Sequence, residues 1–292
     1  MPLNTAMVGT AAEPVVHAVD ARWLMAYAAG LGETLPCYLD TRRPEGIQAH
    51  PMFPVCVEWP AILALRDRAE AFGLTSDEAL RAVHATHDLI IHRGARPGDT
   101  LNTRATVVGV ERRTPGAFQV LRLDTVDAAG APVCTTWQGV LYRGVAVLGE
   151  DRQATDAPPA PGAVTVPAIR SATTLPISAL AAHVYTECAR IWNPIHTDTA
   201  VAARAGLPGL ILHGTATLAL AVSRLLALEA GNDPSRVRRI AGRFSAMVLI
   251  PSTITVRVLS REATPEGPVL RFEVLNAEGK PAVQHGLMGL RA

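Results

Sequence analysis

The sequence predicts an α+β fold made of two copies of one unit, each an antiparallel sheet wrapped around a central helix. Three observations predict this. The turn DAAGAPV at 127–133 returns as NAEGKPAV at 276–283, about half the chain further on. A proline-led turn that feeds an alternating strand occurs at 96–110 and again at 250–260. The second half also has an apolar helix followed by four strand-like runs.

The chain of 292 residues divides into a first repeat at 1–150, a linker at 151–163 and a second repeat at 164–292. The linker, DRQATDAPPAPGA, is rich in Pro, Ala and Asp and poor in large apolar residues, which is typical of a solvated connection. The length is sufficient for two domains of ordinary size, each with its own core.

In the first repeat, the pattern predicts a helix over 58–72. Strands are predicted over 88–92, 101–110, 118–126 and 133–143. The aromatic residues Trp23, Tyr27, Phe53 and Trp59 gather before residue 60 and are expected either to line a cavity or to fill the core.

In the second repeat, a helical pattern begins in the segment 175–192 and breaks at Asn193-Pro194, because the residue before proline is pushed out of the α region. A helix over 215–228 is apolar nearly all round, so other structure must surround it. The runs at 241–250, 252–260, 268–276 and 282–290, separated by Pro, Gly and Asn turns, predict an antiparallel sheet.

Composition excludes several classes of function. With 27 Lys and Arg against 26 Asp and Glu, neither a nucleic-acid partner nor an anionic membrane is indicated. The run 209–228 is as long as a membrane span but carries His213 and Arg224, so we expect a buried core helix. Four widely spaced cysteines and a start without a signal-peptide pattern favour reduced thiols and a cytoplasmic location.

The stretch YTECARIWNPIHTDTAVAARAGLPGLILHGTATLAL, 185–220, resembles the signature of MaoC-like, or type 2, enoyl-CoA hydratases. That signature runs Asp-x-Asn-Pro-x-His, a short helix, a Gly-rich turn, and His-Gly at the start of the central helix. Segments of the first half, among them YAAGLGETLPCYLD, HPMFPVCVEWP, VHATHDLIIHRGARPGDTL and VCTTWQGVLYRG, are similar to the first repeat of two-repeat members.

The resemblance implies a double hotdog fold and (R)-specific hydration of a trans-2-enoyl thioester, or the reverse dehydration. It implies an acyl-CoA or acyl-carrier-protein thioester as the partner, a homodimer, and a degenerate first repeat that accommodates the acyl chain. The first half has no Asn-Pro-x-His motif of its own.

Hydration needs a base to activate water, an acid to protonate Cα, and donors for the thioester oxygen. We expect His196, on a loop with Asn193, to be the base. Gly214 begins the central helix, where free backbone N–H groups can bind the oxygen. His213, Thr215 and Tyr185 are expected to bind substrate.

The departure from the family pattern is Ile191, which occupies the position of the catalytic aspartate. Glu187, four residues earlier, shares a helical face with Ile191 if the helix extends that far, and Asp198 follows the histidine by two residues. Alternatively His196 acts as both base and acid, or the site binds an acyl thioester without hydrating it.

Each residue also has a purely structural interpretation. Asn193 is a common turn residue, Glu187 a solvated helix residue, Asp198 a cap of the next helix, and His213 a packing or hydrogen-bonding group.

A metal site is not expected from the histidines at 84, 87 and 92. Strand alternation predicts that His87 faces away from His84 and His92, and no cysteine or second carboxylate completes a ligand set. No cofactor is expected, since no Gly-rich phosphate loop follows a strand.

Three functions from different classes therefore remain open. The first is a hydratase or dehydratase, the second a catalytically altered or inactive acyl-thioester-binding protein, and the third, less favoured, a hotdog thioesterase. The proton-transfer partner of His196 distinguishes them.

Overall fold

The computed structural model of the protein describes residues 2–70, 74–75, 78, 81–166 and 168–292. Its helices are α1 (Ala21–Gly30), α2 (Pro36–Leu39), α3 (Pro54–Glu70), α5 (Ala181–Ala189), α6 (Thr199–Arg204) and α7 (Gly214–Glu229), with 3-10 turns η1 (Thr5–Met7), η2 (Pro194–His196) and η3 (Pro234–Arg236). Its strands are β1 (Leu3–Asn4), β2 (Val15–Ala18), β3 (Ala82–Ile91), β4 (Thr100–Arg113), β5 (Gly116–Val126), β6 (Pro132–Arg143), β7 (Val147–Leu148), β8 (Ser171–Ile177), β9 (Val237–Phe244), β10 (Ser252–Glu262), β11 (Val269–Leu275) and β12 (Pro281–Leu290).

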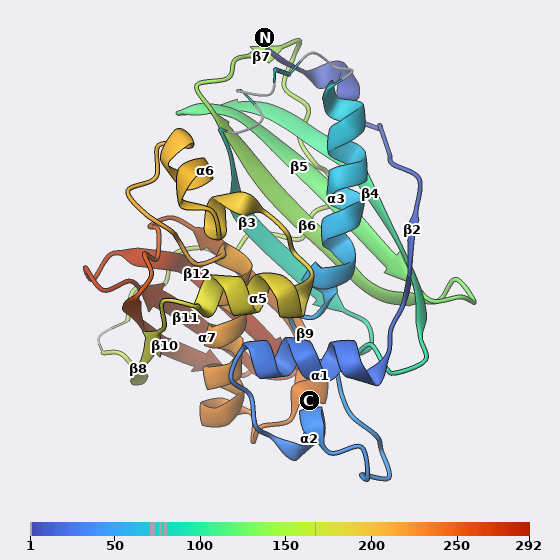
Figure 1. Ribbon diagram of the computed structural model, residues 1–292, viewed down its shortest axis with the longest axis vertical. Helices are drawn as coiled ribbons and strands as arrows, with labels where there is room; N and C mark the ends of the chain where they lie inside the picture. Colours follow the sequence, from blue (N-terminus) through green and yellow to red (C-terminus); the bar gives the residue numbers. More distant parts are fainter. Residues whose placement is uncertain (1, 71–73, 76–77, 79–80, 167) are drawn as a thin grey trace.

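Ten strands form one antiparallel sheet in the order β2-β4-β5-β6-β3-β9-β12-β11-β10-β8 (Figure 1). The order reads as a mirror image about the central β3–β9 pair, so each half of the chain contributes five strands in equivalent positions. At the junction, Asp88 of β3 forms an ion pair of 2.6 Å with Arg239 of β9. The α+β double hotdog architecture is thereby confirmed.

The two turns that suggested duplication are equivalent in detail. Asp127 accepts hydrogen bonds from the backbone of Ala129 and Ala131, and Asn276 accepts the same pair from the backbone two and four residues further on. Gly130 and Gly279 occupy the left-handed region at φ 82° and 75°, which glycine adopts without steric cost. The two repeats are therefore equivalent even in the individual hydrogen bonds of these turns.

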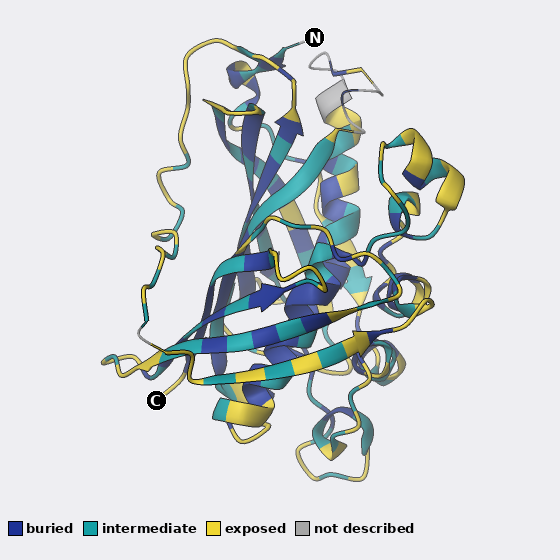
Figure 2. Ribbon diagram, turned by 90° about the vertical axis from the view of Figure 1, so that its left-hand side faces the viewer, coloured by how far each residue is buried: buried dark blue, intermediate teal, exposed yellow. Residues whose placement is uncertain are grey.

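Each half surrounds its own long helix. Helix α3 packs against β4 and β5, and α7 packs against β10 and β12. Nine residues of α7 are buried, as its all-round apolar pattern predicts. Figure 2 shows the buried residues concentrated where the sheet meets these helices. No helix among the residues that the structure describes is long and apolar enough to span a bilayer.

Strand β9 ends earlier than the predicted run 241–250. After Phe244 the backbone of Ser245 and Ala246 still donates to β12. Further on, the carbonyl of Val248 accepts the backbone N–H of Leu212, and the N–H of Ile250 donates to the carbonyl of Leu210. An isolated bridge joins Ile211 to Leu249. Sequence periodicity could not reveal this, because residues 248–250 pair with a loop that is distant in the sequence. The pairing fixes the loop that precedes α7.

Strand β3 is longer than predicted and irregular. A bulge between His84 and Thr86 interrupts its pairing with β6. Because a bulge shifts the alternation by one residue, the prediction that His87 faces away from His84 is wrong, and the two rings lie 5.4 Å apart. No group of three or more potential ligands among the described residues forms a metal site.

Candidate active site

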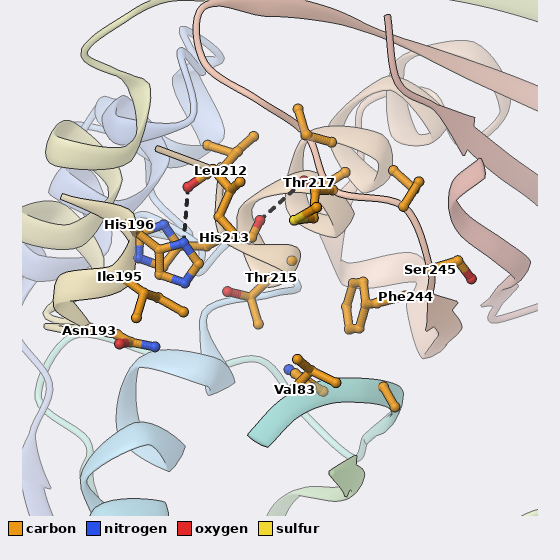
Figure 3. Close-up of a pocket in the computed structure, with 18 of the residues that line it drawn as sticks. Val83, Asn193, Ile195, His196, Leu212, His213, Thr215, Thr217, Phe244 and Ser245 are labelled. Atoms are coloured by element: carbon orange, nitrogen blue, oxygen red, sulfur yellow. Dashed lines mark hydrogen bonds between the residues drawn. The ribbon is translucent and has the colours of Figure 1, made fainter. Parts of the chain in front are cut away.

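A cavity of about 880 Å³ lies between the two repeats. Residues of α3, β3 and β6 line it from the first repeat. The second repeat contributes η2, the loop before α7, the start of α7, and β9 with the segment that follows (Figure 3). Two sequence motifs meet in this cavity, the Asn-Pro-x-His stretch and the His-Gly stretch. Their histidines, at 196 and 213, are 17 residues apart in the sequence.

His196 ends the 3-10 turn that Pro194 begins, and its backbone N–H donates to the carbonyl of Asn193 at 3.2 Å. The Nδ1–H of His196 donates to the backbone carbonyl of Ile211 at 3.0 Å. This bond assigns the proton to Nδ1, so Nε2 carries the lone pair. Burial lowers the pKa of His196 to about 4, against the opposing effect of the Ile211 bond. The imidazole is therefore neutral, with its basic nitrogen unprotonated, near pH 7.

His213 stacks on His196 with ring centroids 3.7 Å apart. Its Nε2 is 3.2 Å from the hydroxyl of Thr186, and the backbone N–H and hydroxyl of Thr217 donate to its carbonyl. Burial, followed by the charge of protonated His196, lowers the pKa of His213 well below its usual value. Two neutral imidazole rings thus line the cavity together. His213 packs against His196 and is also the residue directly before α7.

Gly214 is the first residue of α7, and no side chain caps the helix. The first intrahelical backbone bond is donated by Thr217, which leaves the N–H groups of the first turn for other acceptors. A Cβ at Gly214 would approach the ring of Phe244 to 3.2 Å. Glycine therefore lets an aromatic side chain pack directly beside the helix N-terminus.

Asn193 and Thr215 both line the cavity (Figure 3). The side chain of Asn193 forms no hydrogen bond with a described residue. Thr215 accepts a hydrogen bond of 3.1 Å from the hydroxyl of Tyr185. Tyr185 is buried and does not line the cavity, so its role as a direct substrate contact is not supported; it orients Thr215 from behind.

Ile191 lines the cavity at the position where the family pattern has aspartate. Helix α5 ends at Ala189, and Arg190 adopts a left-handed conformation with φ 57°. The helix therefore does not reach Ile191, and Glu187 does not share a helical face with it, contrary to the prediction. Glu187 is exposed on α5 and lies outside the cavity lining. Asp198 caps α6 by accepting from the backbone of Ala200 and Val201.

Glu58 is the carboxylate that sequence reasoning missed. It lies on α3, is 1% exposed, and lines the cavity from the first repeat. The hydroxyl of Thr136 donates to its Oε1. Burial raises the pKa of Glu58 to about 7, although the Thr136 bond opposes this. A glutamate in the otherwise apolar stretch PVCVEWPAIL was the available signal.

The early aromatic residues divide between the two predicted roles. Trp59 lines the cavity. Trp23 and Tyr27 instead pack their ring edges against Phe53, at centroid distances of 5.1 and 5.8 Å. These three form part of the core.

Family models match both halves of the chain. A MaoC-like domain matches residues 168–267, and a FAS1-like dehydratase domain region matches residues 6–136. The two matches fall on the second and first repeats respectively.

Two of the curated relatives align over short segments. The chain is 38% identical over 63 residues to the peroxisomal enoyl-CoA hydratase 2 of Arabidopsis thaliana, which is 22% of this chain and 20% of the relative. It is 36% identical over 74 residues to a fatty acid synthase β subunit of Emericella nidulans, which is 25% of this chain and 4% of that protein. The chain thus spans a fifth or less of these relatives.

Solved structures are similar over nearly the whole chain. A MaoC-like dehydratase from Phytophthora capsici superposes with a TM-score of 0.83 at 22% identity, covering 97% of this chain and 96% of that one. A Mycobacterium tuberculosis protein described as a double hotdog superposes with a TM-score of 0.61 at 19% identity, with coverage of 97% and 96%. These likenesses show the fold.

Proposed function

Given that this chain belongs to the MaoC-like dehydratase family, we propose that it reversibly hydrates a trans-2-enoyl thioester, delivered by CoA or by a carrier protein, to the (R)-3-hydroxyacyl thioester. The observation that carries the proposal is the state of His196. Its Nδ1–H is bonded to the Ile211 carbonyl, its Nε2 is unprotonated and can accept a proton, and it lines the same cavity as the free N-terminus of α7.

In this reaction His196 Nε2 removes a proton from a water molecule as the hydroxide adds to Cβ of the enoyl group. Negative charge develops on the thioester oxygen, and the backbone N–H groups of Gly214 and Thr215 stabilise it together with the positive end of the helix dipole. The imidazolium of His196 then returns its proton to Cα. One water supplies both the hydroxyl and the hydrogen, so no further reactant is needed.

Because Ile191 occupies the position of the family's aspartate, the proposed reaction has one acid–base group fewer. Such a group contributes on the order of 10²–10⁴-fold to a rate, so hydration by His196 alone is slower than with a carboxylate partner but still catalysed. Neither Glu187 nor Asp198 replaces the aspartate, since the first is exposed and outside the cavity and the second caps α6.

The test is hydration of crotonyl-CoA, followed by loss of the enoyl absorbance, with acyl-CoA binding measured on the same samples. His196→Ala should lower kcat/KM by about 10²–10⁴-fold, and Glu187→Gln serves as a matched control on an exposed residue. If the wild type binds acyl-CoA but does not hydrate crotonyl-CoA, the hydratase proposal is wrong and the protein is an acyl-thioester-binding protein.

A thioesterase is the second candidate, and Glu58 is the observation that favours it. A carboxylate in the cavity can activate water for attack at a carbonyl. Release of free CoA in the same assay, lost in Glu58→Gln and kept in His196→Ala, would support this candidate over hydration.

A further inference from the structure

The part of the cavity inside the first repeat is lined by polar side chains among its apolar ones. Arg66 comes from α3, His84 from β3 and Gln138 from β6. A purely aliphatic acyl chain would cover these groups without offering them hydrogen bonds, which costs free energy. These three polar side chains therefore favour an acyl chain that carries a polar group.

Arg66 is half-buried, and its guanidinium lies over the ring of Trp59 at 5.3 Å. Among the described residues it has neither an ion pair nor a hydrogen bond. Burial lowers the pKa of Arg66, but an arginine remains charged. A charge that is partly removed from water without a protein partner still costs free energy, and the aromatic ring compensates part of that cost.

Gln138 is 6% exposed, and its side-chain amide forms no hydrogen bond with a described residue. It lies two residues after Thr136 on β6, hence on the same face of the strand. A buried amide without a partner carries a desolvation cost like that of Arg66. Two independent polar groups thus line this end of the cavity without partners from the protein.

His84 relates this end to the proposed reaction centre. Its ring lies 4.7 Å from that of Phe244, which in turn borders Gly214. Arg66 and His84 line the same cavity, and the charge of Arg66 adds to the effect of burial in lowering the pKa of His84. Gly214, Phe244, His84 and Arg66 therefore line one and the same cavity, to which the first repeat contributes His84 and Arg66.

We infer that the acyl group ends in a carboxylate, which Arg66 binds as an ion pair while the Gln138 amide donates a hydrogen bond. This rests on the proposed function in one respect, since it takes the ligand to be an acyl thioester. Arg66 and Gln138 are specificity-determining residues in this assignment, and they take no part in the chemical step.

Binding is tested with saturated thioesters, so that no turnover is required. Succinyl-, glutaryl- and adipyl-CoA are compared with butyryl-, valeryl- and hexanoyl-CoA by calorimetry on the intact protein. A charge-assisted hydrogen-bonded pair predicts a preference of about 10- to 100-fold for the best carboxylated chain. Equal affinities, or tighter binding of the methyl-ended chains, would overturn the inference.

Arg66→Gln should reduce the ratio of affinities towards one, and Arg66→Lys should retain part of it, because lysine keeps the charge and loses the bidentate geometry. Arg243→Gln is the matched control at the exposed part of the cavity lining. It should weaken both series alike through the shared CoA. If Arg66→Gln also weakens both series alike, Arg66 contacts CoA and the inference fails.

Failure of this inference is distinguishable from failure of the proposed function. Hydration of crotonyl-CoA without any preference for carboxylated chains would overturn the inference and leave the hydratase proposal standing. A preference that Arg66→Gln removes, in a protein that hydrates no enoyl thioester, would sustain the carboxylate site and overturn the hydratase proposal.

Discussion

At the residue scale, burial sets the protonation state of the groups that line the cavity. It lowers the pKa of His196 to about 4 and raises that of Glu58 to about 7. At pH 7 His196 is therefore neutral, while Glu58 is divided between its protonated and its ionised form. A neutral histidine can accept a proton, and a protonated glutamic acid can donate a hydrogen bond.

These two values predict the pH dependence of kcat/KM for hydration. Because His196 is already deprotonated, we expect no acid limb near pH 6.5, the value of an exposed histidine. An inflection near pH 7 would arise from Glu58 and should vanish in Glu58→Gln. The check is a profile from pH 6 to 9 for both proteins, and a limb near pH 6.5 that survives in Glu58→Gln would contradict the assignment.

Residues differ in how far their roles follow from the sequence. That His196 and Gly214 would lie close together could be predicted because their motifs are local, and both line the cavity; their catalytic roles stay predictions. Glu58 was missed because a single glutamate in an apolar helix gives no sign of which face borders a cavity. Glu187 was proposed on helical spacing that fails where the chain turns left-handed at Arg190. Such details depend on tertiary contacts.

At the element scale, α7 and the loop before it determine the geometry of the site. Backbone pairing between 210–212 and 248–250 fixes the carbonyl of Ile211, which orients His196. The helix was predictable from its apolar pattern, but this pairing was not, because it joins residues separated by the whole of α7 and β9.

Gly214→Ala tests how closely the start of α7 must approach its neighbours. The added Cβ would lie 3.2 Å from the Phe244 ring, so we expect displacement of the ring or of the first helical turn. The expected result is a loss of at least about tenfold in kcat/KM, since misplaced oxyanion donors are costly. Thermal stability should change little, because alanine is the better helix former. The measurement pairs hydration kinetics with melting curves.

The double variant Gly214→Ala with Phe244→Leu is the control. Removing the ring edge should restore part of the lost activity if the clash is responsible. Equal activities of the Gly214→Ala protein and the wild type would show that the close packing has no catalytic role.

At the scale of the whole molecule, one continuous sheet joins the two repeats, and both line the cavity: the proposed residues His196 and Gly214 come from the second repeat and Glu58 from the first. The duplication was visible in the sequence through its turns. The mirror order about β3 and β9 was not, because strand pairing between repeats leaves no periodic signal. The repeat boundaries at 1–150 and 164–292, and the homodimer, stay predictions.

Buried histidines make the fold sensitive to acid. Burial lowers the pKa of His50 to about 3 and those of His87 and His196 to about 4. The unfolded chain binds these protons near pH 6.5 and the folded chain does not, so stability is present above pH 6.5 and lost as the pH falls. At pH 5 each of these three histidines lowers the free energy of unfolding by about 2 kcal/mol. We expect the free energy of unfolding to fall steeply between pH 7 and 5.

His87 allows this to be checked at one position, because neither of its ring nitrogens has a hydrogen-bond partner among the described residues. In His87→Leu the fall in the free energy of unfolding between pH 7 and pH 5 should be about 2 kcal/mol smaller than in the wild type. Chemical denaturation at both pH values gives the comparison, and a pH-independent effect of His87→Leu would refute the prediction.

The central claim is that His196 transfers the proton in a stereospecific hydration. The most direct measurement is the dehydration of (R)- and (S)-3-hydroxybutyryl-CoA, followed by appearance of the enoyl absorbance, in the wild type and His196→Ala. We predict that the wild type converts the (R) isomer alone and that His196→Ala loses this activity. Conversion of the (S) isomer, or undiminished turnover by His196→Ala, would contradict it.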